Sequence, residues 1–312
     1  MTTYIIGHKK PDTDAVVAAM ALEYLYKEAA SFGHTNPKAV LTEALNPETS
    51  FLFEKFSVET PEIITAEAIK DSDRVVLVDH NEASQRLDKL DEEKIVEIVD
   101  HHKVHLNLAS PIFMTFKTWG ASSTIVYNMM KANNVKPDKT LSSLMLAAIL
   151  SDTVGFKSAT TTAKDKEIGA ELATLAEIDD VDAFTLEIFK AKSDTSSLSN
   201  DQIVKNDYKV FEFAKKTLIN QIETVEPEAI LSRKSELLES MAKLKTEEGV
   251  ELVYCAISDI LQVNTKLLML SESEASFAEK AFGGTTVENI LDIGAKLSRK
   301  KEIAPPLEQS IK

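Results

Sequence analysis

The sequence predicts an α/β fold with an amino-terminal, doubly wound, mainly parallel sheet and a smaller carboxy-terminal α/β domain with a mixed sheet. Short apolar runs typical of buried parallel strands alternate with helical segments in the first half. Clusters of aspartate and histidine follow several of these runs, at the edge where parallel sheets bind ligands. A polar stretch at residues 191–200 then precedes a different pattern.

Apolar runs predict the strands of the first domain. Residues 74–78 form a continuous apolar run, as expected for a parallel strand that is buried on both faces. Residues 16–26 carry apolar side chains on nearly every face, which predicts a buried helix. Further strands are expected at 3–6, 38–41, 95–99 and 112–116, and further helices at 123–132 and 141–150.

The second domain has its own pattern. Residues 208–213 and 217–222 alternate apolar and polar side chains, which predicts paired antiparallel strands. An amphipathic helix is expected at 226–244, and further strands at 251–257 and 266–270. The predicted domains are 1–190 and 201–312, joined by a hinge linker at 191–200.

Composition limits the possible partners. The chain has 312 residues and a formal net charge of -15, which argues against a non-specific nucleic-acid surface or an anionic-membrane surface. The single cysteine, Cys255, excludes an intrachain disulfide and favours a reducing compartment. The amino-terminus lacks a signal-peptide pattern, and no apolar run reaches about 18 residues. We therefore expect a cytoplasmic protein without a nucleic-acid or membrane partner.

The first polar cluster follows the strand expected at 3–6. Gly7 allows a tight exit from that strand, and His8 precedes the two aspartates Asp12 and Asp14. In an extended loop the two carboxylates would point to different sides, so they could serve two adjacent metal ions. The alternative is a plain structural role, in which one of the two aspartates caps the following helix.

Three further clusters end apolar segments: Asp79-His80, Asp100-His101-His102 and Asp152. Each has a plain alternative, because an aspartate after a strand is often a turn residue and a histidine beside it is often a surface group. Four of the six histidines, however, lie in the first cluster and in these. Asp152 ends an apolar helix, where its charge opposes the helix dipole and a nearby cation explains it better. Together the clusters predict a divalent-metal site.

The late cluster Arg299-Lys300-Lys301 adds a second kind of chemistry. Alone, it would be a solvated basic patch. Next to a metal site it suggests phosphate chemistry, because a guanidinium binds phosphate as a bidentate fork and an ammonium as a point charge. Two metal ions about 3.5–4 Å apart can hold a shared water, lower its pKa and stabilise in-line displacement.

In these clusters the sequence resembles the family II inorganic pyrophosphatases of the DHH phosphoesterase superfamily. The Asp-His-His triplet identifies only the superfamily, whereas Ser298-Arg299-Lys300 and Asp207-Tyr208-Lys209 are typical of the pyrophosphatases. The matching segments extend over nearly the whole chain and are Gly7-His8-Lys9-Lys10-Pro11-Asp12-Thr13-Asp14, Val78-Asp79-His80-Asn81-Glu82, Val99-Asp100-His101-His102-Lys103, Ser151-Asp152-Thr153 and Leu297-Ser298-Arg299-Lys300-Lys301. The resemblance implies a DHH catalytic domain, a DHHA2-like substrate-binding domain, and hydrolysis of pyrophosphate to two phosphates.

The resemblance also implies a two-metal site that Asp79 bridges. The other implied ligands are His8 and Asp12 for one metal and Asp14, His101 and Asp152 for the second. The family uses manganese or cobalt, with magnesium as a substitute and additional magnesium bound with the substrate. Imidazole ligands make this preference plausible, because magnesium prefers an all-oxygen shell.

Substrate contacts and assembly follow from the same resemblance. His102 would face the substrate, and Lys209, Arg299 and Lys300 would hold its phosphates, with the leaving-group acid open among His102, Lys209 and Lys300. Since the implied ligands precede residue 191 and the implied phosphate-binding lysines and arginine follow it, the active site would lie in the cleft between the two domains, which would close over the substrate. Family members of this two-domain length are commonly homodimers joined through their first domains. The run at 112–116 could be an edge strand that a second copy extends, or an internal strand covered by a helix.

Three positions depart from the family pattern. Ala121-Ser122 stands where the family has Cys-Thr, Glu223 stands where it has Asn, and Lys10 replaces another Asn. None of these is an implied ligand, so we expect activity to be retained. Substrate affinity and metal preference could shift.

Two other functions remain open. A DHH phosphodiesterase acting on short oligonucleotides or cyclic dinucleotides would share the metal motifs, but such enzymes carry Gly-Gly-His in the second domain. Here Gly283-Gly284 is followed by Thr285, and no histidine occurs beyond His105. A non-catalytic metal-dependent binding protein would lack a ligand or the basic cluster, and both are present.

Overall fold

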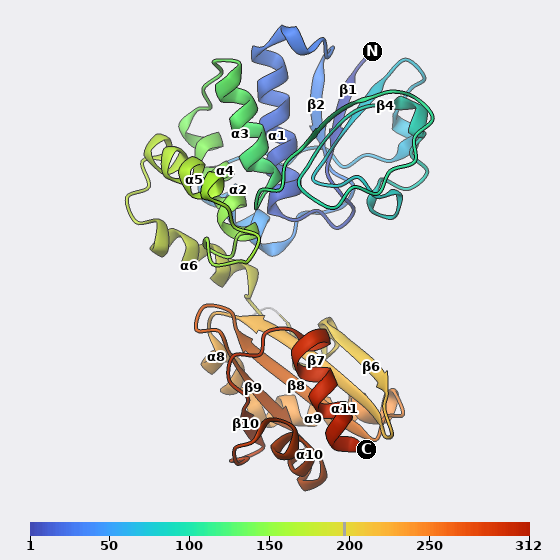
Figure 1. Cartoon of the computed structure of the whole chain (residues 1–312), viewed down its shortest axis with the longest axis vertical. Coiled ribbons are helices and arrows are strands. Elements are labelled where there is room, and N and C mark those ends of the chain that lie inside the picture. Colours follow the sequence, from blue (N-terminus) through green and yellow to red (C-terminus); the bar gives the residue numbers. More distant parts are fainter. Residues whose placement is uncertain (196–197) are drawn as a thin grey trace. The chain divides into compact units, whose positions relative to one another are not determined.

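The computed structural model describes residues 1–195 and 198–312 of the chain (Figure 1). The chain divides into two compact units, Met1–Ala191 and Lys192–Lys312. Each unit is built on a five-stranded sheet, parallel in the first and mixed in the second, which confirms the predicted fold class. Within the described ranges, none of the helices combines the length and apolar character that spanning a bilayer requires.

The predicted linker at 191–200 is partly helical. The helix α6 (Val181–Lys192) runs into its start, and α7 (Asn200–Asn206) begins at its end. Residues 196–197 of the linker lie outside the described residues. Its role as a hinge therefore stays a prediction.

Five parallel strands form the first sheet in the order β2-β1-β3-β4-β5. They are β1 (Thr3–Ile6), β2 (Pro37–Val40), β3 (Arg74–Val78), β4 (Ile95–Asp100) and β5 (Phe113–Phe116). All five predicted strands are confirmed, with ends shifted by at most one residue. The strand order reverses between β1 and β3, and parallel sheets bind ligands beyond the carboxyl ends of strands at such a point.

The strand β5 lies at one edge of this sheet and, among the described residues, pairs only with β4. This position confirms the predicted edge strand and excludes the alternative of an internal strand. Phe113 and Met114 on β5 are 77% and 56% exposed. Backbone groups and apolar side chains of this edge are thus available to another strand.

The helices of the first unit lie on one face of its sheet, where α1 (Thr13–Glu28) and α3 (Ser122–Ala132) contact the strands, whereas loops and short 3-10 turns cover the other face with side chains such as Ile69 and Leu87 (Figure 1). The helices are α1, α2 (Pro47–Phe56), α3, α4 (Lys139–Asp152), α5 (Ala163–Ala176) and α6, with short 3-10 turns at Ala30–Phe32, Ala66–Ala68, Ala83–Gln85 and Glu92–Lys94. The three predicted helices are confirmed as α1, α3 and α4. The helices α2, α5 and α6 go beyond the prediction, because their exposed polar residues weaken the apolar pattern.

The second sheet has the order β10-β9-β8-β7-β6, with β7 and β8 parallel and the other neighbours antiparallel. Its strands are β6 (Tyr208–Glu212), β7 (Lys216–Thr224), β8 (Leu252–Asp259), β9 (Asn264–Met269) and β10 (Ile290–Asp292). The predicted antiparallel pair is confirmed as β6 and β7. The helices are α7, α8 (Pro227–Leu231), α9 (Lys234–Glu247), α10 (Glu272–Phe282), a π-helical turn (Arg299–Ile303) and α11 (Ala304–Ile311).

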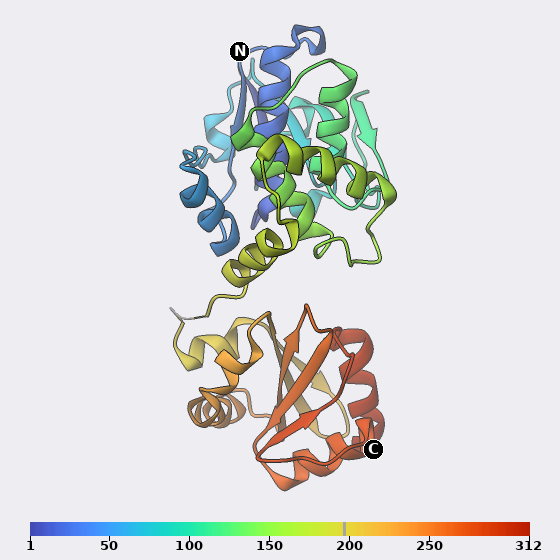
Figure 2. The ribbon, with the colours of Figure 1, turned by 90° about the vertical axis from the view of Figure 1, so that its left-hand side faces the viewer.

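The central strand β8 is buried on both faces. Val253 and Cys255 belong to a core that includes α9, whereas Tyr254 and Ala256 belong to a core that includes α10 and α11 (Figure 2). Alternate side chains of a strand point to opposite faces, so β8 links the two cores of this unit.

The prediction of a single helix at 226–244 is wrong, because the structure has two helices there, α8 and α9, separated at Ser232 and Arg233. Between them the hydroxyl of Ser232 donates to the carbonyl of Ala229 at 2.7 Å, and Arg233 has φ -96 and ψ 17. The Arg233 guanidinium also donates to the carbonyl of Leu198 at 2.9 Å. This break coincides with a long-range contact that an amphipathic pattern does not report.

Candidate metal centre

Acidic and imidazole side chains gather where β1, β3 and β4 end. Among the described residues, three groups could hold a metal ion, each with ligand atoms within 4.8 Å of one another. They are Asp14-Asp79-His101-Asp152, His8-Asp12-Asp79 and Asp79-His101-His102. All six side chains predicted as ligands fall in these groups, and Asp79 belongs to every group.

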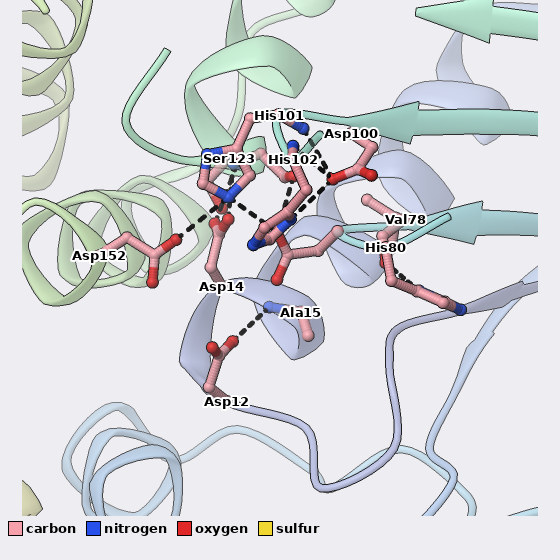
Figure 3. Close-up of polar contacts among 12 residues, drawn as sticks. Asp12, Asp14, Ala15, Val78, His80, Asp100, His101, His102, Ser123 and Asp152 are labelled. Atoms are coloured by element: carbon pink, nitrogen blue, oxygen red, sulfur yellow. Dashed lines mark hydrogen bonds and ion pairs between the residues drawn. The ribbon is translucent and has the colours of Figure 1, made fainter. Parts of the chain in front are cut away.

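The loop after β1 provides His8 and Asp12. Asp12 is the N-cap of α1, and its Oδ1 accepts a hydrogen bond from the backbone of Ala15 at 3.0 Å (Figure 3). Its Oδ2 lies 3.5 Å from Nε2 of His8. Burial alone would lower the pKa of His8, but the carboxylates of Asp12 and Asp79 outweigh it and raise the pKa to about 9. The capping role and the predicted ligand role therefore use different oxygens of Asp12.

Asp79 is the centre of the cluster. It follows β3 directly, is 1% exposed and has φ 63, a left-handed conformation that is uncommon for aspartate. Its Oδ2 lies 3.6 Å from Nε2 of His8, and its Oδ1 lies 3.2 Å from Nε2 of His101. The hydroxyl of Ser122 donates to Oδ1 at 2.9 Å. The two oxygens of one carboxylate thus face two different histidines.

His101 turns its Nε2 towards the carboxylates. Its Nδ1 lies 2.9 Å from the carbonyl oxygen of Trp119, an acceptor, so Nδ1 carries the proton. Its Nε2 is buried without a hydrogen-bond partner in the described structure and lies 3.5 Å from Oδ2 of Asp152. Burial would lower the pKa of His101, yet Asp79, Asp14 and Asp152 together raise it to about 10. This nitrogen is therefore placed where a positive charge is favoured.

The remaining carboxylates carry more negative charge than the site neutralises. Asp14 is fully buried in the first turn of α1, and its oxygens accept from the backbone N–H groups of Ser122 at 2.6 Å and Ser123 at 2.9 Å. Burial and the charge of Asp79 raise its pKa to about 7. Burial and the charges of Asp14, Asp79 and Asp12 raise the pKa of Asp152, the last residue of α4, well above its usual value. A divalent cation would correct this imbalance.

His102 is more open than the proposed ligands. Its side chain is 54% exposed, and its Nδ1 donates to Oδ1 of Asp100 at 2.9 Å. Asp100 is fully buried and also accepts from the amide of Asn81 at 2.6 Å. Burial would raise the pKa of Asp100, but hydrogen bonds from His102 and Asn81 outweigh it and lower the pKa. Asp100 therefore orients the ring of His102.

His80 is a structural residue of this rim. It is 3% exposed, and its Nδ1 donates to the carbonyl of Val78 at 2.9 Å. Burial lowers the pKa of His80 to about 4, so its ring is neutral at physiological pH. Figure 3 shows its ring turned away from the carboxylates, in agreement with its absence from the predicted ligands.

The basic residues predicted to bind phosphate lie in the second unit. Lys209 is on β6, with Nζ 5.7 Å from the centre of the Phe211 ring. Arg299 starts the π-helical turn, and its guanidinium donates to the backbone oxygen and to Oδ1 of Asp207, both at 2.8 Å. Lys300 is the next residue of that turn. The structure thus brings Arg299 beside the segment that carries Lys209.

Sequence reasoning missed the groups that hold Asp14. The N–H groups of Ser122 and Ser123 belong to the first turn of α3, far from Asp14 in sequence. The one available signal is Ala121, which precedes α3 and has no side-chain oxygen to cap it. A helix start without a local cap takes its acceptor from elsewhere, and here the acceptor is Asp14.

Comparison with known proteins agrees with this geometry. The model of the DHH family, N-terminal domain, matches residues 2–149, and the DHHA2 domain model matches residues 186–310. A protein of Methanocaldococcus jannaschii named manganese-dependent inorganic pyrophosphatase is 36% identical, over 98% of this chain and 98% of its own. A protein of Methanothrix thermoacetophila with the same name is 35% identical, over 99% and 98% of the two chains.

Solved structures give the same result. A crystal structure described as a family II inorganic pyrophosphatase of Methanococcus jannaschii matches with a TM-score of 0.66 and 34% identity, covering 99% of both chains. An exopolyphosphatase-related protein of Bacteroides fragilis, with a TM-score of 0.52 and 15% identity, covering 99% of this chain and 91% of its own, shows a likeness of fold alone. The chain therefore belongs to the family of manganese-dependent inorganic pyrophosphatases.

Proposed function

We propose that this protein hydrolyses inorganic pyrophosphate to two phosphates and uses manganese as its cofactor. The observation that carries the proposal is Asp79, whose Oδ2 faces His8 at 3.6 Å and whose Oδ1 faces His101 at 3.2 Å. A carboxylate that turns one oxygen to each side can bridge two metal ions. The names of the full-length relatives support both the reaction and the metal.

The donor set fits two ions. We assign His8 and Asp12 to one, Asp14, His101 and Asp152 to the other, and Asp79 to both. The buried Nε2 of His101 supports this assignment, because it faces carboxylates and has no hydrogen-bond partner among the described residues. Mixed imidazole and carboxylate donors suit manganese or cobalt better than magnesium, which would be a substitute or accompany the substrate.

The side chains around these ligands then have defined tasks. Two bound ions would neutralise charge on pyrophosphate and lower the pKa of the attacking water. Asp100 holds Nδ1 of His102, which leaves Nε2 of that exposed ring to donate to a phosphate oxygen. His102 is also a candidate for the acid that protonates the leaving phosphate, together with Lys209 and Lys300.

We further assign phosphate binding to Lys209, Arg299 and Lys300. Two donors of Arg299 are fixed by Asp207, which orients the planar guanidinium and leaves its other N–H groups for an anion. Lys209 and Lys300 add point charges that favour a highly charged substrate over a neutral one.

We also propose that the protein forms a homodimer through its first units. Support comes from β5, an edge strand with Phe113 at 77% and Met114 at 56% exposure. Pairing this edge with the same edge of a second copy would cover both side chains. The single cysteine, Cys255, is free and buried, which is in keeping with the cytoplasmic location we propose.

A phosphate-release assay with manganese tests the function. Purified protein is given pyrophosphate in one reaction and a dinucleotide in another, and Asp79→Asn is assayed in parallel. We expect wild-type protein to hydrolyse pyrophosphate and not the dinucleotide. Cleavage of the dinucleotide alone would instead indicate a DHH phosphodiesterase, and manganese binding without turnover of either would indicate a non-catalytic binding protein.

A further inference from the structure

The segment 119–123, which leads into α3, supports one half of the metal centre from behind. It contacts three of the proposed ligands, Asp14, Asp79 and His101. Its contributions are two backbone N–H groups, one hydroxyl and one carbonyl, at 2.6–2.9 Å. Since these contacts fix ligand oxygens and the ring of His101, the position of the segment determines the position of the ligands.

The carboxylate of Asp165 anchors this segment. Asp165 is fully buried at the third position of α5, where it forms a capping box with Thr162. Its oxygens accept from the backbone N–H of Gly120 at 2.9 Å and 3.0 Å and from the hydroxyl of Thr124 at 2.7 Å. One side chain thus joins the amino-terminus of α5 to the segment and to the first turn of α3. Both helix amino-termini favour its negative charge.

The backbone approaches this anchor closely because residue 120 is glycine. A Cβ atom on Gly120 would lie 2.5 Å from Cγ2 of Thr153 and 3.0 Å from Oδ2 of Asp165. Thr153 follows the proposed ligand Asp152 at the end of α4. The segment, α5 and the end of α4 therefore meet without space for adjustment, so a change at the anchor is transmitted to the ligands.

We propose that Asp165 is a positioning residue of the metal centre: it fixes the segment 119–123, which holds Asp14 and His101 in the geometry that binds one of the two metal ions. This inference rests on the two-metal function proposed above. The carboxylate of Asp165 accepts hydrogen bonds from four donors in the segment, α3 and the start of α5. Asp165 therefore acts through the segment and is not itself a ligand. His8 and Asp12 depend on the loop after β1, and of the ligands of their ion only the shared Asp79 contacts the segment, so this ion should respond less to Asp165 than the ion at Asp14 and His101.

Isothermal titration of the full chain with manganese tests the inference in the variant Asp165→Asn. The asparagine amide would replace one acceptor oxygen by an N–H group, which cannot accept from donors such as the Gly120 N–H and the Thr124 hydroxyl. The segment should therefore loosen. We expect affinity for one of the two ions to fall about tenfold or more, as outer-shell changes typically cause, while the other affinity falls less because only the shared Asp79 links it to the segment. The titration can be repeated in a His8→Gln background, which retains the ligand group around His101. The ion that still binds there should show the loss of affinity caused by Asp165→Asn.

Two further variants separate positioning from general destabilisation. Glu274 is a matched control, since it is also fully buried at the third position of a capping-box helix, α10, but in the second unit. Glu274→Gln should lower the melting temperature of the metal-free protein and leave both manganese affinities unchanged. Thr124→Val removes a single hydroxyl from Asp165 and provides a milder test that does not depend on Asp165→Asn folding. It should weaken the same ion, and Thr124→Ser should restore it.

The outcomes are distinguishable. Two ions in wild-type protein, with unchanged affinities in Asp165→Asn and Thr124→Val, would overturn the inference and leave the proposed function intact. Equal weakening of both ions would also overturn it, because Asp165 would then be a general structural residue. A single manganese ion in wild-type protein would overturn the two-metal proposal and this inference with it.

Discussion

The two ligand groups that share Asp79 are built in different ways. Asp14 is fully buried, and the first turn of α3 binds both of its oxygens. His8 and Asp12, in contrast, lie on the loop after β1, with side chains 17% and 44% exposed. The first group is therefore fixed by packed helices and the second by a short surface loop. We infer that the buried group is preformed and binds manganese more tightly, whereas the loop group adjusts to its ion.

The largest effect is expected for Asp79→Asn, because this residue joins the two groups. Asparagine tolerates the left-handed backbone at φ 63, so the fold should persist. Both ions should bind more weakly, and turnover should fall on the order of 10³-fold, since the loss of a single preorganised electrostatic group already costs that much. Metal analysis and a phosphate-release assay measure the two effects. Near-normal metal content and activity would refute a shared ligand.

His102→Gln tests whether the exposed histidine belongs to either ligand group. If His102 donates to the substrate, turnover should fall about 10²-fold while both manganese affinities are retained. Kinetics and metal titration of the same preparation give both numbers. A parallel loss of metal and activity would make His102 a ligand, as its distance to Asp79 and His101 also allows.

Arg299→Ala should leave both ligand groups intact, because Arg299 lies in the second unit. The charge-assisted hydrogen bonds of a guanidinium contribute roughly 1.5–3 kcal/mol, so KM for pyrophosphate should rise about tenfold or more. Lys301→Ala is a control from the same turn that we do not assign to the substrate. The proposed phosphate role is wrong if both variants have wild-type KM.

The pH dependence of metal binding should separate the two groups. Burial would lower the pKa of His101 and of His8, but nearby carboxylates raise them to about 10 and about 9, so both carry protons at about pH 8 in the metal-free protein. Manganese must displace these protons, and each affinity should rise about tenfold per pH unit.

Asp14 should make the pH dependence of metal binding to the buried group steeper at acidic pH. The pKa of Asp14 is raised to about 7 and that of Asp152 is raised well above its usual value, so below about pH 7 the buried group must release at least one proton beyond that of His101, whereas the loop group releases one from His8. Calorimetry in two buffers of different ionisation enthalpy counts these protons. Equal slopes for the two ions at about pH 6 would contradict the assignment of Asp14 to the buried group.

The smallest effect on catalysis is expected at the edge strand. Phe113→Asp places a charge on β5, where Phe113 is 77% exposed, and should shift the protein from dimer to monomer in sedimentation. Both ligand groups should still bind manganese. Val287, which is 66% exposed in the second unit, gives the control Val287→Asp. A monomeric wild-type protein in the presence of manganese would disprove the dimer.

Much of this arrangement is predictable from the sequence, for a local reason. A buried parallel strand such as β3 is a continuous apolar run, and Asp79 directly follows it, so strand and ligand are found together. The carboxyl ends of parallel strands share one edge, which predicts that His8, Asp79 and His101 meet. The roles of the individual ligands and substrate-binding residues came from the resemblance of these motifs to a known family, because local patterns do not give them.

The supports of the site were not predictable in this way. Asp165 is 45 residues from Gly120, whose N–H group donates a hydrogen bond to it. Its neighbours in sequence suggest only a helix cap. The break at Arg233 likewise coincides with a hydrogen bond to a carbonyl 35 residues away. Such contacts form only in the folded chain, and no local periodicity reports them.

The central claim is that two manganese ions share Asp79, and anomalous diffraction at the manganese edge tests it most directly. Crystals grown with manganese should show two peaks about 3.5–4 Å apart. One oxygen of Asp79 should bind each peak, with His8 and Asp12 on one side and Asp14, His101 and Asp152 on the other. A single peak, or two peaks of which only one touches Asp79, would contradict the account.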